Sequence, residues 1–211
     1  MATSNQGAAD RQPPAALGFR VHSGWAVVVA VAGAPAAPTV VDRRRIELVD
    51  RDRPGSVQPY HTAAQLGPKQ AEEFIEDCAQ RTRLLTIQAL CPVIDHLTHG
   101  GLKVVASGIL LSSGRPTTDL RATLASHALI HTAEGHFFRA ALTHASEHYR
   151  FPVVGVKERD LYSRASADLG ASPDEVRRRV AEWGHSLGPP WRQDEKVAAL
   201  VAWLALRGPT R

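Results

Sequence analysis

The chain has 211 residues, of which 44% are hydrophobic and 22% are charged, as in a soluble globular protein with one substantial domain or two small ones. The formal net charge of +4 comes almost entirely from arginine, because the sequence has 21 Arg and 4 Lys. This excess is too mild to indicate a nucleic-acid-binding protein by itself, and abundant Ala, Arg, Gly and Pro are also typical of GC-rich coding DNA.

The cysteines and the first residues bear on the cellular compartment. Cys78 and Cys91 lie in apolar segments without a CxxC partner, which argues against a disulfide framework and a cysteine zinc site and favours the cytoplasm. The first ten residues lack a basic start followed by an apolar core, so no signal peptide is expected. The apolar run 25–34 is too short to span a bilayer, and we expect no membrane contact.

The first half of the chain is predicted to form a tail, an antiparallel meander and a long helix. Residues 1–17 are small, polar and proline-containing, which predicts a disordered tail before a single domain over 18–211. A high density of Val and Ala predicts a strand at 19–31, and alternating apolar and polar residues predict a second at 39–48, with a short third strand at 57–61 and turns at 34–38 and 52–56. A helix with an apolar stripe should follow from Pro68, Pro92 should kink or divide it, and Gly100 and Gly101 should end it.

The second half is predicted to alternate strands and helices. Apolar strands are expected at 102–111 and 151–156, and a histidine-rich helix that ends near Tyr149 should lie between them. Ser172-Pro-Asp-Glu is typical of a helix start, with serine as the N-cap and proline in the first turn. Further helices are expected at 160–169, at 173–183 and, after the stiff connector Gly188-Pro-Pro-Trp, at 194–207.

This order of elements resembles the ribonuclease H-like fold and, within it, the Holliday-junction resolvase branch. The resemblance covers residues 18–207. The first strand, Gly18-Phe-Arg-Val-His-Ser-Gly-Trp-Ala-Val-Val, is similar to a family strand Gly-Ile-Asp-x-Gly that continues into Gly-Trp/Tyr-Ala/Gly. The last helix, which opens Asp194-Glu-Lys-Val-Ala-Ala-Leu, is similar to a closing helix that starts with acids and continues Ala-Leu-Ala. The resemblance implies an α/β protein with a mixed five-stranded sheet, an antiparallel meander followed by parallel strands, and helices on both faces.

The resemblance also implies a nuclease in which carboxylates hold two Mg²⁺ ions about 4 Å apart. The first-strand aspartate would fall near 21–23, where this sequence has His22, and the fourth-strand glutamate would fall near 107–109, where it has no acid. Of the carboxylates that the resemblance implies, this sequence keeps only Asp194 and Glu195 of the closing helix. One pair of carboxylates does not replace three or four around two hard cations, so we expect the family fold without its standard metal chemistry.

The strongest lead to function is the histidine-rich segment, because five of the ten histidines lie between His127 and His148. In a helix, His127, His131 and Glu134 share one face, where they suit metal binding, proton transfer or phosphate binding. The alternative is a helix that starts only at 132–135, which would break this face.

Topology extends this lead to a candidate site at one end of the sheet. We expect His22, Ser107 and Asp194 to meet in a cleft that His131 and Glu134 border. The predicted catalytic residues are His22, His131, Glu134 and Asp194; the predicted ligands of a divalent metal (Mg²⁺, Mn²⁺ or Zn²⁺) are Asp194, Glu195 and His131; and the predicted substrate-binding residues are Ser23, Tyr60, His61, Arg139, Trp191 and Lys196.

Several of these residues have a structural interpretation as well. The histidines can be partly buried and satisfied by hydrogen bonds. Arg139 can pair with a neighbouring acid, and Trp191 can fasten its loop to the core; for both we favour the structural role. Lys196 can neutralise Asp194 instead of binding phosphate.

Three functions are compatible with the sequence. The first is a divergent ribonuclease H-like protein that acts on or binds nucleic acid through a histidine/carboxylate site, as a metal-dependent nuclease or phosphodiesterase if it is an enzyme. The second is a non-catalytic scaffold that binds a partner. The third is a small-molecule enzyme with His/Glu acid–base chemistry in a closed pocket. The first is preferred because unusual polar residues gather at one expected end of the sheet.

Overall fold

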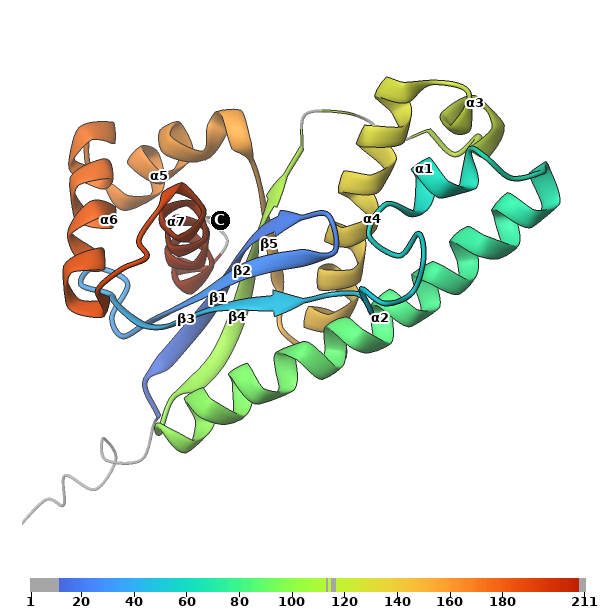
Figure 1. Ribbon diagram of the computed structural model, residues 1–211. Helices are drawn as coiled ribbons and strands as arrows, with labels where there is room; N and C mark the ends of the chain where they lie inside the picture. The colour runs from blue at the N-terminus through green and yellow to red at the C-terminus, as the bar shows by residue number, and fades with distance from the viewer. Residues whose placement is uncertain (1–11, 113, 115–116, 209–211) are drawn as a thin grey trace, which may run out of the picture.

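One mixed sheet runs through the centre of the protein (Figure 1). The computed structural model describes residues 12–112, 114 and 117–208. Its strands are β1 (Pro14–His22), β2 (Trp25–Ala32), β3 (Thr39–Glu47), β4 (Lys103–Leu111) and β5 (Val153–Lys157), in the spatial order β3-β2-β1-β4-β5. β1, β2 and β3 form an antiparallel meander, and β4 and β5 continue the sheet parallel to β1. The predicted fold class is therefore confirmed.

Helices cover both faces of this sheet (Figure 1). The first group is α1 (Pro59–Ala63), α2 (Pro68–His99), α3 (Leu120–Leu124) and α4 (His127–His148). The second is α5 (Leu161–Leu169), which follows the short 3-10 turn η1 (Glu158–Asp160), then α6 (Pro173–Leu187) and α7 (Gln193–Arg207). Pro92 does not divide α2, which stays helical throughout. Among the described residues, no helix combines the length and apolar character needed to cross a membrane.

Two strand predictions near the N-terminus are wrong. The expected single strand 19–31 is a hairpin, in which β1 ends at His22 and β2 starts at Trp25. The two residues between them form a turn in which Gly24 has a φ of +79°, a conformation that suits glycine. The expected strand 57–61 is not a strand, because Pro59 occupies the first turn of α1.

The predicted disordered tail also extends too far. β1 already begins at Pro14, so residues 14–17 pair in the sheet, and Ala15, Ala16 and Leu17 are fully buried. Residues 1–11 of the predicted tail lie outside the described part of the chain.

The closing helix α7 lies directly on β1. A Cβ atom at Gly18 would fall 2.0 Å from the carbonyl oxygen of Ala198, so only glycine permits this approach of helix and strand. Residues 197–206 of α7 are all buried. This packing fixes the N-terminus of α7 at the carboxyl end of β1.

Candidate functional site

Charged side chains meet where β1 ends and α7 begins. Nε2 of His22 lies 2.9 Å from Oδ2 of Asp194, as the sequence predicted for these two residues. Arg20, two residues earlier on β1, points to the same face of the sheet and places its Nε 3.6 Å from Oδ1 of Asp194. Its Nη1 lies 2.9 Å from Oε2 of Glu158, directly after β5. The guanidinium group of Arg20 therefore pairs with two carboxylates.

A second guanidinium group belongs to this site. Arg139 of α4 donates from Nε to the carbonyl oxygen of Leu110, near the end of β4, at 2.9 Å. Its Nη1 is buried without a hydrogen-bond partner. Burial, and then the positive charge of Arg20, lower the pKa of Arg139, while Glu158 opposes the shift. We call Arg20, His22, Arg139, Glu158 and Asp194 the strand-end cluster.

The favoured structural role of Arg139 was a salt bridge to a neighbouring acid. Within the described residues Arg139 has no ion pair and bonds to the backbone instead. The strand end explains this difference, because β1 pairs with β4 only as far as Ile109, and the carbonyl group of the next residue, Leu110, accepts from α4 instead.

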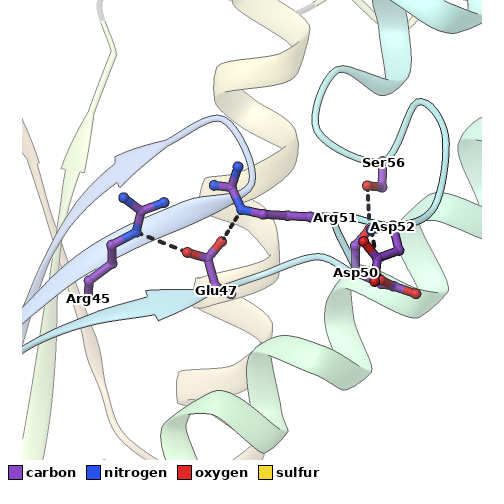
Figure 2. A network of polar contacts seen from close by, with 6 residues as sticks. All are labelled: Arg45, Glu47, Asp50, Arg51, Asp52 and Ser56. Carbon is purple, nitrogen blue, oxygen red and sulfur yellow. Dashed lines mark hydrogen bonds and ion pairs between the residues drawn. The ribbon is translucent and has the colours of Figure 1, made fainter.

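A row of planar side chains continues from the strand-end cluster across β2 and β3. The rings of His22 and Trp25 are stacked, with centroids 4.1 Å apart and planes at 10°. The guanidinium carbon of Arg45 lies 4.1 Å from the centroid of Trp25, a cation–π contact. Figure 2 shows Glu47 between Arg45 and Arg51, and its two oxygens accept at 2.9 and 2.7 Å. Glu47 thus holds Arg45 against the indole ring.

The turn after this row is held by its own polar contacts. Asp50 accepts from the amide of Asp52 at 3.0 Å, and Ser56 donates to the carbonyl oxygen of Asp50 at 2.6 Å (Figure 2). The chain then enters α1, which carries Tyr60 and His61.

A second group of polar residues lies between α1 and α4. Nδ1 of His61 lies 2.9 Å from Oε1 of Glu134, and the His61 amide donates to the same oxygen at 3.2 Å. The ring of His61 also contacts the rings of His127 and His131, with centroids 5.5 and 4.9 Å away. We call His61, His127 and His131 the histidine triplet.

The predicted shared face of the histidine-rich helix is confirmed. α4 starts at His127 with Ser126 as its N-cap, so the helix does not begin at 132–135. The rings of His127 and His131 lie one turn apart, with centroids 4.4 Å from each other. Burial, and then the charge of Glu134, raise the pKa of Tyr60, which neighbours His61.

The two polar groups are not one metal site. No group of three ligating atoms within 4.8 Å contains Asp194 or Glu195 in the described part of the chain, and the one such group there is the histidine triplet. Glu195 is buried and accepts from the amide of Arg192 at 2.8 Å, which closes the first turn of α7. The predicted ligand set of Asp194, Glu195 and His131 is therefore not brought together.

The other predicted residues lie apart from both groups. Ser107 is buried in β4 and pairs with Leu17, five residues before His22, so it does not reach the strand-end cluster. Ser23 is exposed in the β1–β2 turn. Trp191 packs against Gly184 and donates to the carbonyl oxygen of Val180 at 2.8 Å, which matches its favoured structural role. Lys196 lines a hollow beside Trp191 and does not neutralise Asp194.

A hollow of about 420 Å³ lies between α2 and α4. Tyr60, Thr82 and His136 are among its lining residues, but no member of the strand-end cluster or of the histidine triplet lines it. The predicted acid–base residues His22, His131, Glu134 and Asp194 therefore do not line this hollow.

Sequence reasoning missed two charged members of the strand-end cluster, Arg20 and Glu158. A signal was present for Arg20, since residues two apart on a strand share a face and His22 had been singled out. Glu158 follows β5 directly, but its contact with β1 depends on the strand order, which the sequence does not specify.

The sheet order, with an antiparallel meander and two parallel strands flanked by helices, defines a ribonuclease H-like fold. No protein-family model matches the sequence, and no curated protein does. Among solved structures, the protein is similar to Thermus thermophilus RuvC, with a TM-score of 0.51 and 13% identity over 90% of this chain and 91% of that chain. T. thermophilus RuvC in complex with Holliday junction substrate gives a TM-score of 0.50 and 10% identity over 90% of both chains. At these identities the likeness concerns the fold, which is that of the Holliday junction resolvases.

Proposed function

We propose that the protein binds branched nucleic acid at the strand-end cluster without a metal ion and without cleaving it. The observation that carries the proposal is the pair of guanidinium groups, Arg20 and Arg139, at the carboxyl ends of β1 and β4. Ligands commonly bind at the carboxyl ends of parallel strands in open α/β sheets. The likeness to a resolvase solved with a Holliday junction supports branched nucleic acid as the ligand.

Guanidinium groups suit phosphate because their N–H donors match its oxygens in geometry and charge. Arg139 is partly exposed and forms no ion pair within the described residues, so its positive charge is available to a phosphate that reaches the cluster. The Glu158 side chain is 56% exposed, and an ion pair so exposed contributes only about 0–1 kcal/mol, so its displacement by phosphate costs little. The stacked row of His22, Trp25 and Arg45 extends the surface with planar groups on which bases can stack.

The same cluster disfavours two-metal cleavage. Two Mg²⁺ ions need several carboxylates, and this cluster offers Asp194 and Glu158 with the cation Arg20 between them. The fixed positive charge of Arg20 repels a divalent cation and takes up the carboxylate oxygens. We therefore expect binding in the presence of a chelator and no strand cleavage when Mg²⁺ is added.

The test is fluorescence anisotropy with a labelled four-way DNA junction, at a series of salt concentrations with EDTA present. Each phosphate contact contributes about 0.9 to the slope of log affinity against log salt for duplex DNA. Arg139→Gln should lower this slope by about one, and the Arg20→Gln/Arg139→Gln double variant by about two. Arg207→Gln, at the far end of α7, is the matched control and should keep the wild-type slope.

Two results would overturn the proposal. One is an unchanged salt slope in both variants when circular dichroism shows that they are folded. The other is Mg²⁺-dependent cleavage of the junction that Asp194→Ala abolishes, because the strand-end cluster would then be a metal centre after all.

A further inference from the structure

The histidine triplet lies on two helices that the chain brings together over a long sequence separation. His127 occupies the first position of α4 and His131 the next turn, while His61 comes from α1. One ligand atom from each imidazole lies within 4.8 Å of the other two. In a tetrahedral zinc site with Zn–N bonds of about 2.0–2.1 Å, ligand nitrogens lie about 3.3 Å apart. The imidazoles of His127 and His131 are exposed, and their rotation can bring the three nitrogens to the shorter separation of a zinc site.

Glu134 prepares His61 for this role. When the Glu134 carboxylate accepts a hydrogen bond from Nδ1 of His61, Nε2 of that ring keeps its lone pair for a metal ion. The Glu134 side chain is 5% exposed and also accepts from the His61 backbone amide. Glu134 therefore holds His61 through both its ring and its backbone. A carboxylate behind a ligating imidazole is the usual support for a metal-bound histidine.

The other two histidines have no competing role. Within the described residues, neither His127 nor His131 has a hydrogen-bond partner, and the ring–ring contacts of both are with histidines. Three neighbouring imidazoles suit a metal because each offers a neutral nitrogen ligand. The positive end of the α4 dipole opposes a cation here, and the buried negative charge of Glu134 offsets that effect.

From this geometry we propose that His61, His127 and His131 bind one Zn²⁺ ion, with Glu134 as a positioning residue behind His61. Imidazole ligands suit late first-row divalent ions, and a three-histidine set leaves a fourth position for water or a substrate oxygen. The site is separate from the strand-end cluster and does not depend on the proposed function.

The test is a titration of tag-free protein with Zn²⁺ in competition with a chromophoric chelator, together with Co²⁺ absorption spectra. Wild type should bind one Zn²⁺ per chain, and its Co²⁺ form should show the visible bands of a tetrahedral site. His131→Ala and His61→Ala should lose this binding. Glu134→Gln should keep the stoichiometry and weaken affinity by about 10- to 100-fold. His144→Ala removes an exposed histidine of the same helix and should bind as wild type does.

The proposal is overturned if wild type binds no Zn²⁺ in competition with the chelator. It is also overturned if folded His131→Ala binds Zn²⁺ with wild-type affinity. Circular dichroism of each variant separates loss of a ligand from loss of fold.

Discussion

Arg20 and His22 alternate with Val21 along β1, so both side chains leave the sheet on the face that carries α7. Their shared partner, Asp194, is the acid that resemblance placed in a metal site. A guanidinium group stays charged at every accessible pH, and it has no acceptor with which to bind a metal. On the proposal that this cluster binds phosphate, one arginine on this strand accounts for anion binding where the resemblance implied cation binding.

Tyr60 gives a residue-scale prediction about alkaline stability. Burial and the charge of Glu134 raise its pKa above the ordinary value of about 10. Above that pH the unfolded chain loses the phenol proton while the folded protein keeps it, so the free energy of unfolding falls as pH rises. Below about pH 10 both states keep the proton and this loss is absent. Tyr60→Phe cannot ionise and should lessen the alkaline fall.

Urea denaturation of wild type and Tyr60→Phe at pH 8 and above pH 10 measures this effect. Burial also raises the pKa of Tyr149, but this residue is present in both proteins. The two proteins should therefore differ in the pH dependence of the free energy of unfolding because of Tyr60. Equal slopes would show that Tyr60 does not titrate differently in the folded protein.

The sequence predicted part of the site because part of it is local. His131 and Glu134 are three residues apart, and helical spacing alone places them on one face. His61 is 73 residues away from Glu134, and no periodic pattern links them. His22 was predicted from its place near the first-strand aspartate that the resemblance implies. A polar residue among Val and Ala is costly unless it is bonded, and Asp194 supplies that bond.

At the scale of single elements, α6 shows how closely local chemistry can set a helix boundary. Ser172 accepts from the amide of Glu175, and Pro173 occupies the first helical position. Both features were readable in the sequence, and the helix begins where they predict. The β1–β2 hairpin was missed because Ser23 and Gly24 interrupt the apolar run for only two residues, and a turn so short leaves the flanking pattern almost continuous.

Ser172→Ala should therefore lower the free energy of unfolding by about 1 kcal/mol, because a backbone amide of the first turn loses its acceptor. Ser186→Ala, in the last turn of the same helix, is the matched control, since within the described residues the Ser186 hydroxyl bonds to the carbonyl of Trp183 alone. Urea denaturation measures both. An equal loss in the two variants would contradict a specific capping role for Ser172.

At the scale of the whole molecule, one sheet separates two apolar layers. Leu142 belongs to the layer that α2 and α4 form, and Leu200 to the layer of α5, α6 and α7. Both side chains are fully buried. The sequence predicted two covered faces from the mostly apolar strand that became β4, and β2 is likewise apolar throughout.

We predict that the described domain unfolds as a unit, because both layers depend on the same strands. Leu142→Ala and Leu200→Ala should each lower the free energy of unfolding by about 2–5 kcal/mol and shift one common transition. Leu84→Ala, where the leucine is 62% exposed, should change little. Calorimetry and circular dichroism should give the same midpoint for each variant. A second transition that only one of the two core variants shifts would indicate separate units.

The position of α7 in the chain has a consequence for biosynthesis. The strand faces that it covers, including Val27, Val29 and Val31 of β2, are made early, whereas residues 193–207 leave the ribosome last among the described elements. At about 5–20 residues per second, roughly 10–35 s separate the synthesis of β2 from that of α7. We expect the nascent chain to expose these apolar residues during this interval and to bind chaperones that recognise apolar segments.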